Sequence, residues 1–162
     1  TRERNKKVLV DLSVLTESMY LFTYHNDPKP FIDYISQNIV SRLSFRDLEK
    51  FDEKYLKIIL LNNLFYNSYY IPLSETEVTF GYTDVDLQRS RIYPDIPNEW
   101  VLEIKYVKKS DEKNEAVLQS KRDEAHKQLN RYRNSHLFKD RTDVRYLTII
   151  FIGKDKTEIV ES

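Results

Sequence analysis

The chain contains no cysteine, only two glycines and a single methionine among its 162 residues. The absence of cysteine excludes disulfides and thiolate metal sites, and it fits a reducing compartment, so we expect a cytoplasmic protein. No apolar run approaches the ~20 residues of a membrane span, and no signal peptide is visible. We therefore expect no membrane partner.

An excess of basic charge is also missing, because 26 Lys and Arg residues balance 26 Asp and Glu residues. Non-specific binding to nucleic acid depends on neutralising phosphates, so a neutral domain needs a local basic patch for it. One such group gathers in the second half of the sequence: Lys105, Lys108, Lys109, Lys121, Arg122, Lys127, Arg131 and Arg133. A solvated helix face with interleaved acids explains any one of them equally well.

What is present is a compact-domain composition, with 40% hydrophobic and 13% aromatic residues. Its densest group of chemical signals is GYTDVDLQRSRIYPDIPNEWVLEIKYVKK, residues 81–109. Two apolar stretches bracket a polar turn that contains proline, which favours a hairpin. A symmetric hairpin with its midpoint between Tyr93 and Pro94 places Asp84 opposite Glu103, about 5 Å apart at the backbone.

Side chains alternate along a strand, so Glu103 and Lys105 share one face and Ile104 takes the other. Two facing carboxylates repel each other unless a cation lies between them, and carboxylate oxygens suit Mg²⁺ or Mn²⁺. We expect Asp84 and Glu103 to bind this ion, with the Ile104 carbonyl as a further ligand. Lys105 would orient or help deprotonate the attacking water. The alternative is a solvated face with ordinary surface charges.

A second aspartate competes for the role of metal ligand, because Pro94-Asp95 and Glu103-Ile104-Lys105 spell the pattern PD-x7-ExK. Asp95 falls in the predicted turn, however, and proline followed by aspartate is ordinary turn chemistry. We therefore favour Asp84 as the ligand. Asp86 lies two residues further along the same predicted strand, so this second acid points to the same face as Asp84.

The remaining pattern predicts a mixed α/β sheet in the order helix, three antiparallel strands, helix, strand. Residues 1–43 form a helical extension or a linker from a preceding domain, and residues 44–162 form the main domain. Its first helix begins with Ser44 as N-cap, and Gly81 makes a tight reversal between the first two strands. The expected elements are a helix at 44–66, strands at 70–79, 82–88 and 99–107, a helix within 110–135, a strand at 145–152 parallel to the third strand, and a short edge strand in the tail.

Five segments together resemble the PD-(D/E)xK nuclease superfamily. They are FDEKYLKIIL (51–60), YYIPLSETEV (69–78), GYTDVDL (81–87), WVLEIKYVKK (100–109) and AHKQLNRY (125–132). More narrowly, they resemble the C-terminal nuclease-like domain that follows an AAA-ATPase-like domain in large bacterial proteins, many from Bacteroidetes. The resemblance implies a restriction-endonuclease-like core, a Mg²⁺- or Mn²⁺-dependent nuclease ancestry and an ATPase-like domain in the same full-length chain.

The resemblance also implies roles for residues outside the hairpin. In the superfamily the first core helix often supplies a glutamate to the metal site, and Glu53 matches it; the alternative is an ordinary i,i+4 pair with Lys57. Gln128 and Tyr132 resemble a motif of the exonuclease-like branch that holds nucleic acid and orders the site. Lys121 and Arg131 on the same helix would bind substrate, with DNA favoured over RNA.

Three functional classes remain open at this point. The intact set of Asp84, Glu103 and Lys105 favours a nuclease. The neutral charge favours a catalytically idle domain that serves as a nucleic-acid-binding or assembly module, or as a regulatory module of a fused ATPase. The sequence sets neither the oligomeric state nor the choice between cleavage at ends and internal cleavage.

Overall fold

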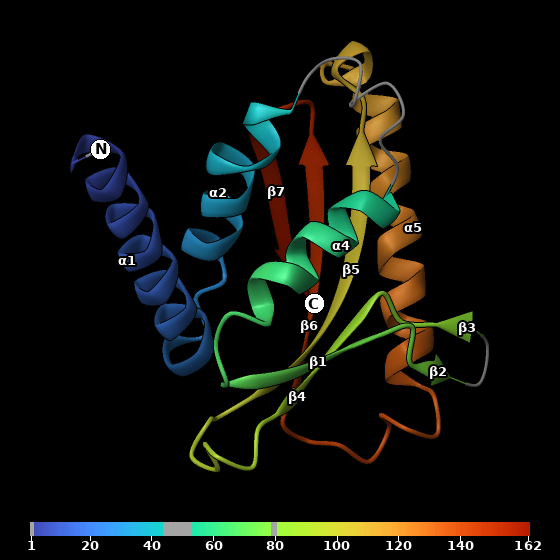
Figure 1. The fold of residues 1–162 in the computed structure, drawn as a ribbon. Coiled ribbons are helices and arrows are strands. Elements are labelled where there is room, and N and C mark those ends of the chain that lie inside the picture. The colour runs from blue at the N-terminus through green and yellow to red at the C-terminus, as the bar shows by residue number, and fades with distance from the viewer. Residues whose placement is uncertain (1, 44–52, 79–80) are drawn as a thin grey trace.

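The computed structural model describes residues 2–43, 53–78 and 81–162, and it is built around one five-stranded sheet (Figure 1). The strands lie in the order β1-β4-β5-β6-β7, and a separate two-stranded ribbon pairs β2 with β3. The strand bounds are β1 Tyr70–Ser74, β2 Glu77–Val78, β3 Gly81–Tyr82, β4 Val85–Arg89, β5 Glu99–Val107, β6 Val144–Ile152 and β7 Lys156–Glu161.

The helices are α1 Arg2–His25, α2 Lys29–Asn38, α4 Glu53–Leu64 and α5 Glu115–Arg133, with short 3-10 turns at Val40–Arg42 and Lys109–Asp111. The start that we predict at Ser44 lies outside the described residues. Asn114 caps α5, because its side chain accepts a hydrogen bond from the backbone N–H of Val117. None of the described helices is long and apolar enough to cross a bilayer.

The predicted hairpin register is the one that the structure contains. Val85 lies opposite Leu102 and Leu87 opposite Trp100. One more step along the same register brings Asp84 beside Glu103. β5 then runs parallel to β6, the two being connected through α5, and β7 returns antiparallel to β6. The predicted restriction-endonuclease-like core, with a mixed sheet, is therefore confirmed.

The first two predicted strands, 70–79 and 82–88, are each interrupted, so the expectation of two continuous strands is wrong. β1 ends at Ser74, and Glu75 adopts a positive φ of 57° that breaks the extended backbone. On the facing segment, residues 83 and 84 separate β3 from β4. Gly81 does use a positive φ, of 142°, next to the reversal.

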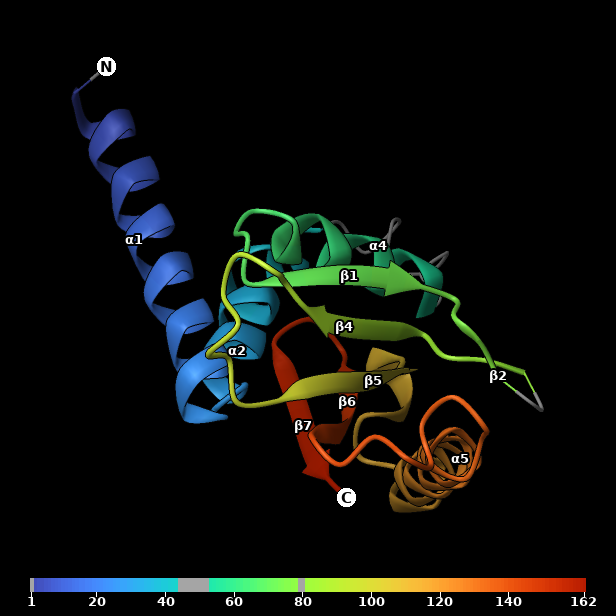
Figure 2. The same cartoon turned by 90° about the horizontal axis from the view of Figure 1, so that it is seen from below.

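Both faces of the sheet are covered by helices, as Figure 2 shows with α4 and α2 on one side and α5 on the other. The first face packs a core that unites α1, α2 and α4 with alternate residues of β5 and β6; its members include Met19, Phe22, Phe31, Leu56, Leu60, Leu102, Ile104 and Ile149. The second face packs Val101 and Tyr146 against Leu129 and Tyr132 of α5. Burial on both faces explains why β6 is apolar almost throughout.

The N-terminal helices share the core of the sheet domain. Phe22 of α1 meets Trp100 of β5 edge-on, with ring centroids 5.1 Å apart, and it also contacts Phe31 of α2. Among the described residues the outer strand β1 pairs with β4 alone, and it tolerates Pro72 because an edge strand can lack one ladder donor. β5, the strand that carries Glu103 and Lys105, lies inside this sheet between β4 and β6.

Candidate active site

Four side chains form what we call the carboxylate–lysine cluster: Asp84, Glu103, Lys105 and Tyr132. The Lys105 ammonium lies 2.9 Å from Glu103 Oε1, and the Tyr132 hydroxyl of α5 donates to Glu103 Oε2 at 2.9 Å. Glu103 and Lys105 are 1% and 5% exposed. They point to the same face because they are two residues apart on β5.

Asp84 reaches the cluster from the point where β4 begins. Its Oδ2 accepts a hydrogen bond from the backbone N–H of Ile104 at 2.9 Å. This carboxylate replaces the strand partner that Ile104 would otherwise have, since the β4–β5 pairing stops at Val85 and Leu102. The N–H and C=O of one strand residue point to the same side, so the Ile104 carbonyl also faces the side of Asp84.

The surroundings of Asp84 and Glu103 disfavour the charged form of both carboxylates. Burial, followed by repulsion from Asp84, raises the pKa of Glu103 to about 7 in spite of the nearby lysine. Burial also raises the pKa of Asp84, against the opposing effects of the Ile104 hydrogen bond and Lys105. For Lys105, burial lowers the pKa, but the attraction of Glu103 outweighs it and the pKa is raised overall. The cluster therefore keeps a charged ammonium beside two carboxylates that lack full compensation.

A divalent cation suits this donor set. Within the described residues, no three His, Cys, Asp or Glu side chains form a group that could hold a metal ion. Mg²⁺, however, usually keeps several waters and needs only one or two carboxylates with substrate oxygens. Two partly desolvated carboxylates of raised pKa, with a backbone carbonyl directed to the same side, fit that requirement.

Glu53, at the start of α4, lies at the far end of β5 from the hairpin turn. Its Oε1 accepts hydrogen bonds from the backbone N–H of Tyr106 at 3.4 Å and from the Lys121 ammonium at 3.1 Å. Its charge also raises the pKa of Asp84 and of Lys105, so it acts within the same electrostatic environment. The metal role of Glu53 stays a prediction. The alternative pair with Lys57 is wrong, because Lys57 binds Glu75 at 2.8 Å.

A hollow of about 380 Å³ opens beside Glu53 and Lys121 and is lined further by Tyr106, Lys108 and Asp111. It adjoins the end of β5, two residues beyond Lys105.

The remaining predicted substrate residues lie in the second half of α5. Gln128 lies one turn before Tyr132, and its Oε1 is buried without a hydrogen-bond partner among the described residues. Lys127 and Arg131 flank it along two shallow hollows of about 280 and 340 Å³. The substrate roles of Gln128, Tyr132, Lys121 and Arg131 stay predictions; what the structure adds is that Tyr132 fixes the orientation of Glu103.

Much of the basic group identified in the sequence is engaged by other residues. Arg122 binds Glu158 and Glu115, and Lys109 binds Glu112. In the described part of the chain, three members of the group have neither an ion pair nor a side-chain hydrogen bond: Lys108, Lys127 and Arg131. The basic surface available to a polyanion is thus smaller than the sequence suggests.

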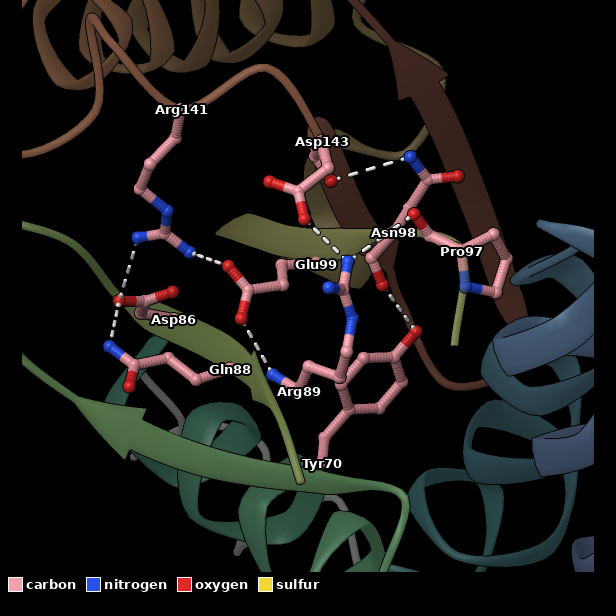
Figure 3. A network of polar contacts seen from close by, with 9 residues as sticks. All are labelled: Tyr70, Asp86, Gln88, Arg89, Pro97, Asn98, Glu99, Arg141 and Asp143. Atoms are coloured by element: carbon pink, nitrogen blue, oxygen red, sulfur yellow. Dashed lines mark hydrogen bonds and ion pairs between the residues drawn. The ribbon is translucent and has the colours of Figure 1, made fainter. Parts of the chain in front are cut away.

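A second polar assembly, which we call the arginine network, lies at the hairpin end of β4 and β5 (Figure 3). Its members are Asp86, Arg89, Glu99, Arg141 and Asp143. Arg141 binds Glu99 and lies 3.7 Å from Asp86, while Arg89 binds Asp143 and the Pro97 carbonyl. The network ties the hairpin to the loop that follows α5.

Asp86, expected as a second acid of the site, belongs to this arginine network. It is 0% exposed, accepts a hydrogen bond from Gln88 at 3.1 Å and leaves Oδ1 without a partner among the described residues. Burial raises its pKa, against the effects of Gln88 and Arg141. Asp95 lies in the connecting turn, exposed, and accepts a hydrogen bond from the Tyr24 hydroxyl of α1 at 3.4 Å.

Two residues that sequence reasoning missed lie next to the cluster, Lys57 and Glu75. Lys57 shares the buried face of α4 with Leu56 and Leu60, so its position in an apolar helix stretch is the signal that could have identified it. Glu75 looked like an ordinary strand residue, and nothing in the sequence marks its positive φ.

Comparison with protein-family models gives one match, to the PD-(D/E)XK nuclease superfamily, over residues 51–161. The matched region contains α4, all seven strands and α5, and therefore every residue of the carboxylate–lysine cluster. Searches of curated proteins and of solved structures found no match.

Proposed function

Because the chain belongs to the PD-(D/E)XK nuclease superfamily, we propose that it hydrolyses phosphodiester bonds of nucleic acid with Mg²⁺ or Mn²⁺. One observation carries the proposal: Asp84, just before β4, is bonded to β5 beside Glu103 and Lys105, and both carboxylates have a raised pKa. Members of this superfamily are generally nucleases that use divalent metals, and the three residues have the chemistry that such a reaction needs.

Each residue has a distinct task in the proposed reaction. Asp84 and Glu103 would hold the metal, with the Ile104 carbonyl as a third oxygen ligand, and the ion would supply Lewis-acid stabilisation of the phosphate and a more acidic water. Lys105 remains protonated, because its pKa is raised. It therefore orients the water and stabilises charge on the phosphate as a hydrogen-bond donor rather than acting as a base. Tyr132 keeps Glu103 in position.

The proposal extends to substrate and context. Gln128, Lys127 and Arg131 would bind the substrate backbone along α5, and Glu53 would complete the metal environment from α4. DNA is preferred over RNA as substrate. The resemblance supports an ATPase-like domain elsewhere in the full-length chain, and the cysteine-free sequence supports a cytoplasmic location.

The test is cleavage of a fluorescently labelled oligonucleotide with Mn²⁺ or Mg²⁺, followed on a denaturing gel. Asp84→Asn, Glu103→Gln and Lys105→Met should each lower the cleavage rate by about a thousandfold or more, because each removes a ligand or a charge at the reacting phosphate. Asp95→Asn is the matched control and should cleave at the wild-type rate. Activity that depends on Asp95 and not on Asp84 would reverse the assignment.

A catalytically idle module is the second candidate, and the overall neutral charge favours it. In that case the full chain would bind the oligonucleotide at low salt without cleaving it. Neither metal nor Asp84→Asn would then change the amount of intact substrate.

A further inference from the structure

Lys57 is a buried lysine that no part of the proposed reaction uses. It lies on the sheet-facing side of α4 and is 8% exposed. Its ammonium binds Glu75 Oε1 at 2.8 Å, and its charge lowers the pKa of Asp84 against the larger effect of burial. A lysine is seldom buried without a specific partner, and the partner of this one, Glu75, is joined to Asp84 by a backbone hydrogen bond.

The partner of Lys57 is held in an unusual backbone conformation. Glu75 has a φ of 57°, in the left-handed region that glycine occupies without strain and that other residues adopt only at a cost in conformational energy. Its backbone N–H donates to the carbonyl of Asp84 at 3.4 Å, so the break in β1 lies directly across from the proposed metal ligand. The register is the same on both sides of the break, since Ser74 pairs with Val85 and Glu77 with Tyr82, so the break alters the backbone at Glu75 without shifting the pairing.

The two side chains differ in their access to solvent. The Glu75 side chain is 61% exposed, whereas that of Lys57 is 10% exposed. The carboxylate therefore covers an otherwise buried ammonium from the solvent side. A carboxylate and a phosphodiester both present anionic oxygens to a lysine, so an arriving phosphate can take over the Glu75 position without leaving Lys57 unpaired.

We propose that Lys57 is a second phosphate-binding lysine of this site, held by Glu75 until a phosphodiester oxygen of the nucleic acid replaces the carboxylate. The inference rests on the proposed nuclease function and adds a substrate contact from α4, on the opposite face of the sheet from α5. Glu75 is then a competitor for the lysine, which gives the two residues opposite effects on substrate binding.

The experiment measures binding of a 5′-fluorescein single-stranded oligonucleotide to the full 162-residue chain by anisotropy, in EDTA and over a series of salt concentrations. Lys57→Met should weaken binding by about 5-fold and lower the slope of log K against log salt by about 0.7, the value for one phosphate contact on a single strand. Glu75→Gln should strengthen binding several-fold, because the amide no longer competes for Lys57.

Lys54→Met is the matched control, since it removes an exposed lysine from the same helix. Its affinity should stay close to that of the wild type. Circular dichroism and urea midpoints establish that each variant is folded. If Lys57→Met does not fold, Glu75→Gln is compared with Glu77→Gln, which removes an exposed carboxylate from the same segment, and only Glu75→Gln should gain affinity beyond this general effect of charge.

Three results would overturn the inference. Lys57→Met and Glu75→Gln could weaken binding equally, which marks a purely structural pair. Lys54→Met could lose as much affinity as Lys57→Met, or binding could be unchanged in both Lys57→Met and Glu75→Gln. If the wild type still cleaves with Mn²⁺ in an Asp84-dependent way, such a result removes only the role of Lys57. If the wild type neither binds nor cleaves, the proposed function falls together with this inference.

Discussion

The carboxylate–lysine cluster and the arginine network lie at opposite ends of the β4–β5 pairing, and they are constructed in different ways. In the arginine network, the guanidinium of Arg141 joins two acids, and that of Arg89 joins an acid and a backbone carbonyl. In the carboxylate–lysine cluster, Lys105 binds Glu103, whereas among the described residues Asp84 receives only the backbone N–H of Ile104 as a hydrogen-bond donor. One assembly connects separate segments; the other leaves the Asp84 carboxylate without a directly bound cation.

The choice of cation explains the difference. A guanidinium is planar and presents several donors in fixed directions, so it suits permanent connections between segments. An ammonium is a compact charge on a flexible stem, and it can exchange one anionic partner for another. The comparison therefore assigns stability to the arginine network and chemistry to the carboxylate–lysine cluster.

The largest expected contrast is in stability. Arg141→Met should lower the free energy of unfolding by about 3 kcal/mol, because it leaves the buried Asp86 carboxylate without its cation. Asp84→Asn should leave the free energy of unfolding unchanged or raise it, because the amide oxygen can still accept from Ile104 while the repulsion of Glu103 disappears. Urea denaturation of the metal-free chain measures both.

Arg91→Met, on the exposed turn of the same hairpin, is the control for loss of an arginine and should change stability little. The double variant Asp86→Asn with Arg141→Met should recover part of the loss. A greater loss of stability from Asp84→Asn than from Arg141→Met would invalidate the division between the two assemblies.

A smaller effect is expected from pH. The pKa of Glu103 is raised from 4.5 to about 7 in the folded chain, so its contribution to stability is complete below pH 4.5 and is lost as the pH rises through 7. The metal-free protein should lose about 2 kcal/mol from this group between pH 5 and pH 8. Lys105 does not contribute in this window, because its raised pKa lies above its ordinary value of 10.5.

Chemical denaturation at pH 5 and pH 8 measures this dependence in the wild type and in Glu103→Gln. The variant should show a flatter profile, since it has no carboxyl to titrate. A profile that is equally steep in both proteins would place the titrating group elsewhere.

The smallest effect is expected at Tyr132. Tyr132→Phe removes one hydrogen bond to Glu103 and should cost about 1 kcal/mol of stability. It should lower the cleavage rate by about 10-fold, as expected for a partner that orients a metal ligand. Tyr82→Phe, which removes an exposed hydroxyl, is the control. An unchanged cleavage rate in Tyr132→Phe would mean that Glu103 is positioned by Lys105 and the strand alone.

Patterns local to one segment predicted much of this molecule. The third strand was expected at 99–107 and is found at Glu99–Val107, since alternating burial and a polar turn define it. The hairpin register also follows from one chain segment. For the same reason the proximity of Asp84 and Glu103 could be expected from the sequence alone.

Contacts between distant segments could not be predicted in this way. Helical spacing gives Lys57 as the alternative partner of Glu53, but Glu75, 18 positions beyond Lys57 in the sequence, takes the pair. Asp86 shares the strand face of Asp84 by sequence spacing. Its partner Arg141 comes from a loop, and a loop has no periodicity from which the position of Arg141 could be predicted. The positive φ of Glu75 has no signal either, because glycine is the residue that normally marks such a conformation.

Titration calorimetry with Mn²⁺ on the wild type, Asp84→Asn and Asp86→Asn tests the central claim most directly, because the two aspartates lie two residues apart in the same segment. The account predicts that the wild type and Asp86→Asn bind the ion with similar affinity and that Asp84→Asn loses most of the binding. Retention of the wild-type affinity by Asp84→Asn, or its loss only in Asp86→Asn, would contradict the assignment of the metal to the carboxylate–lysine cluster.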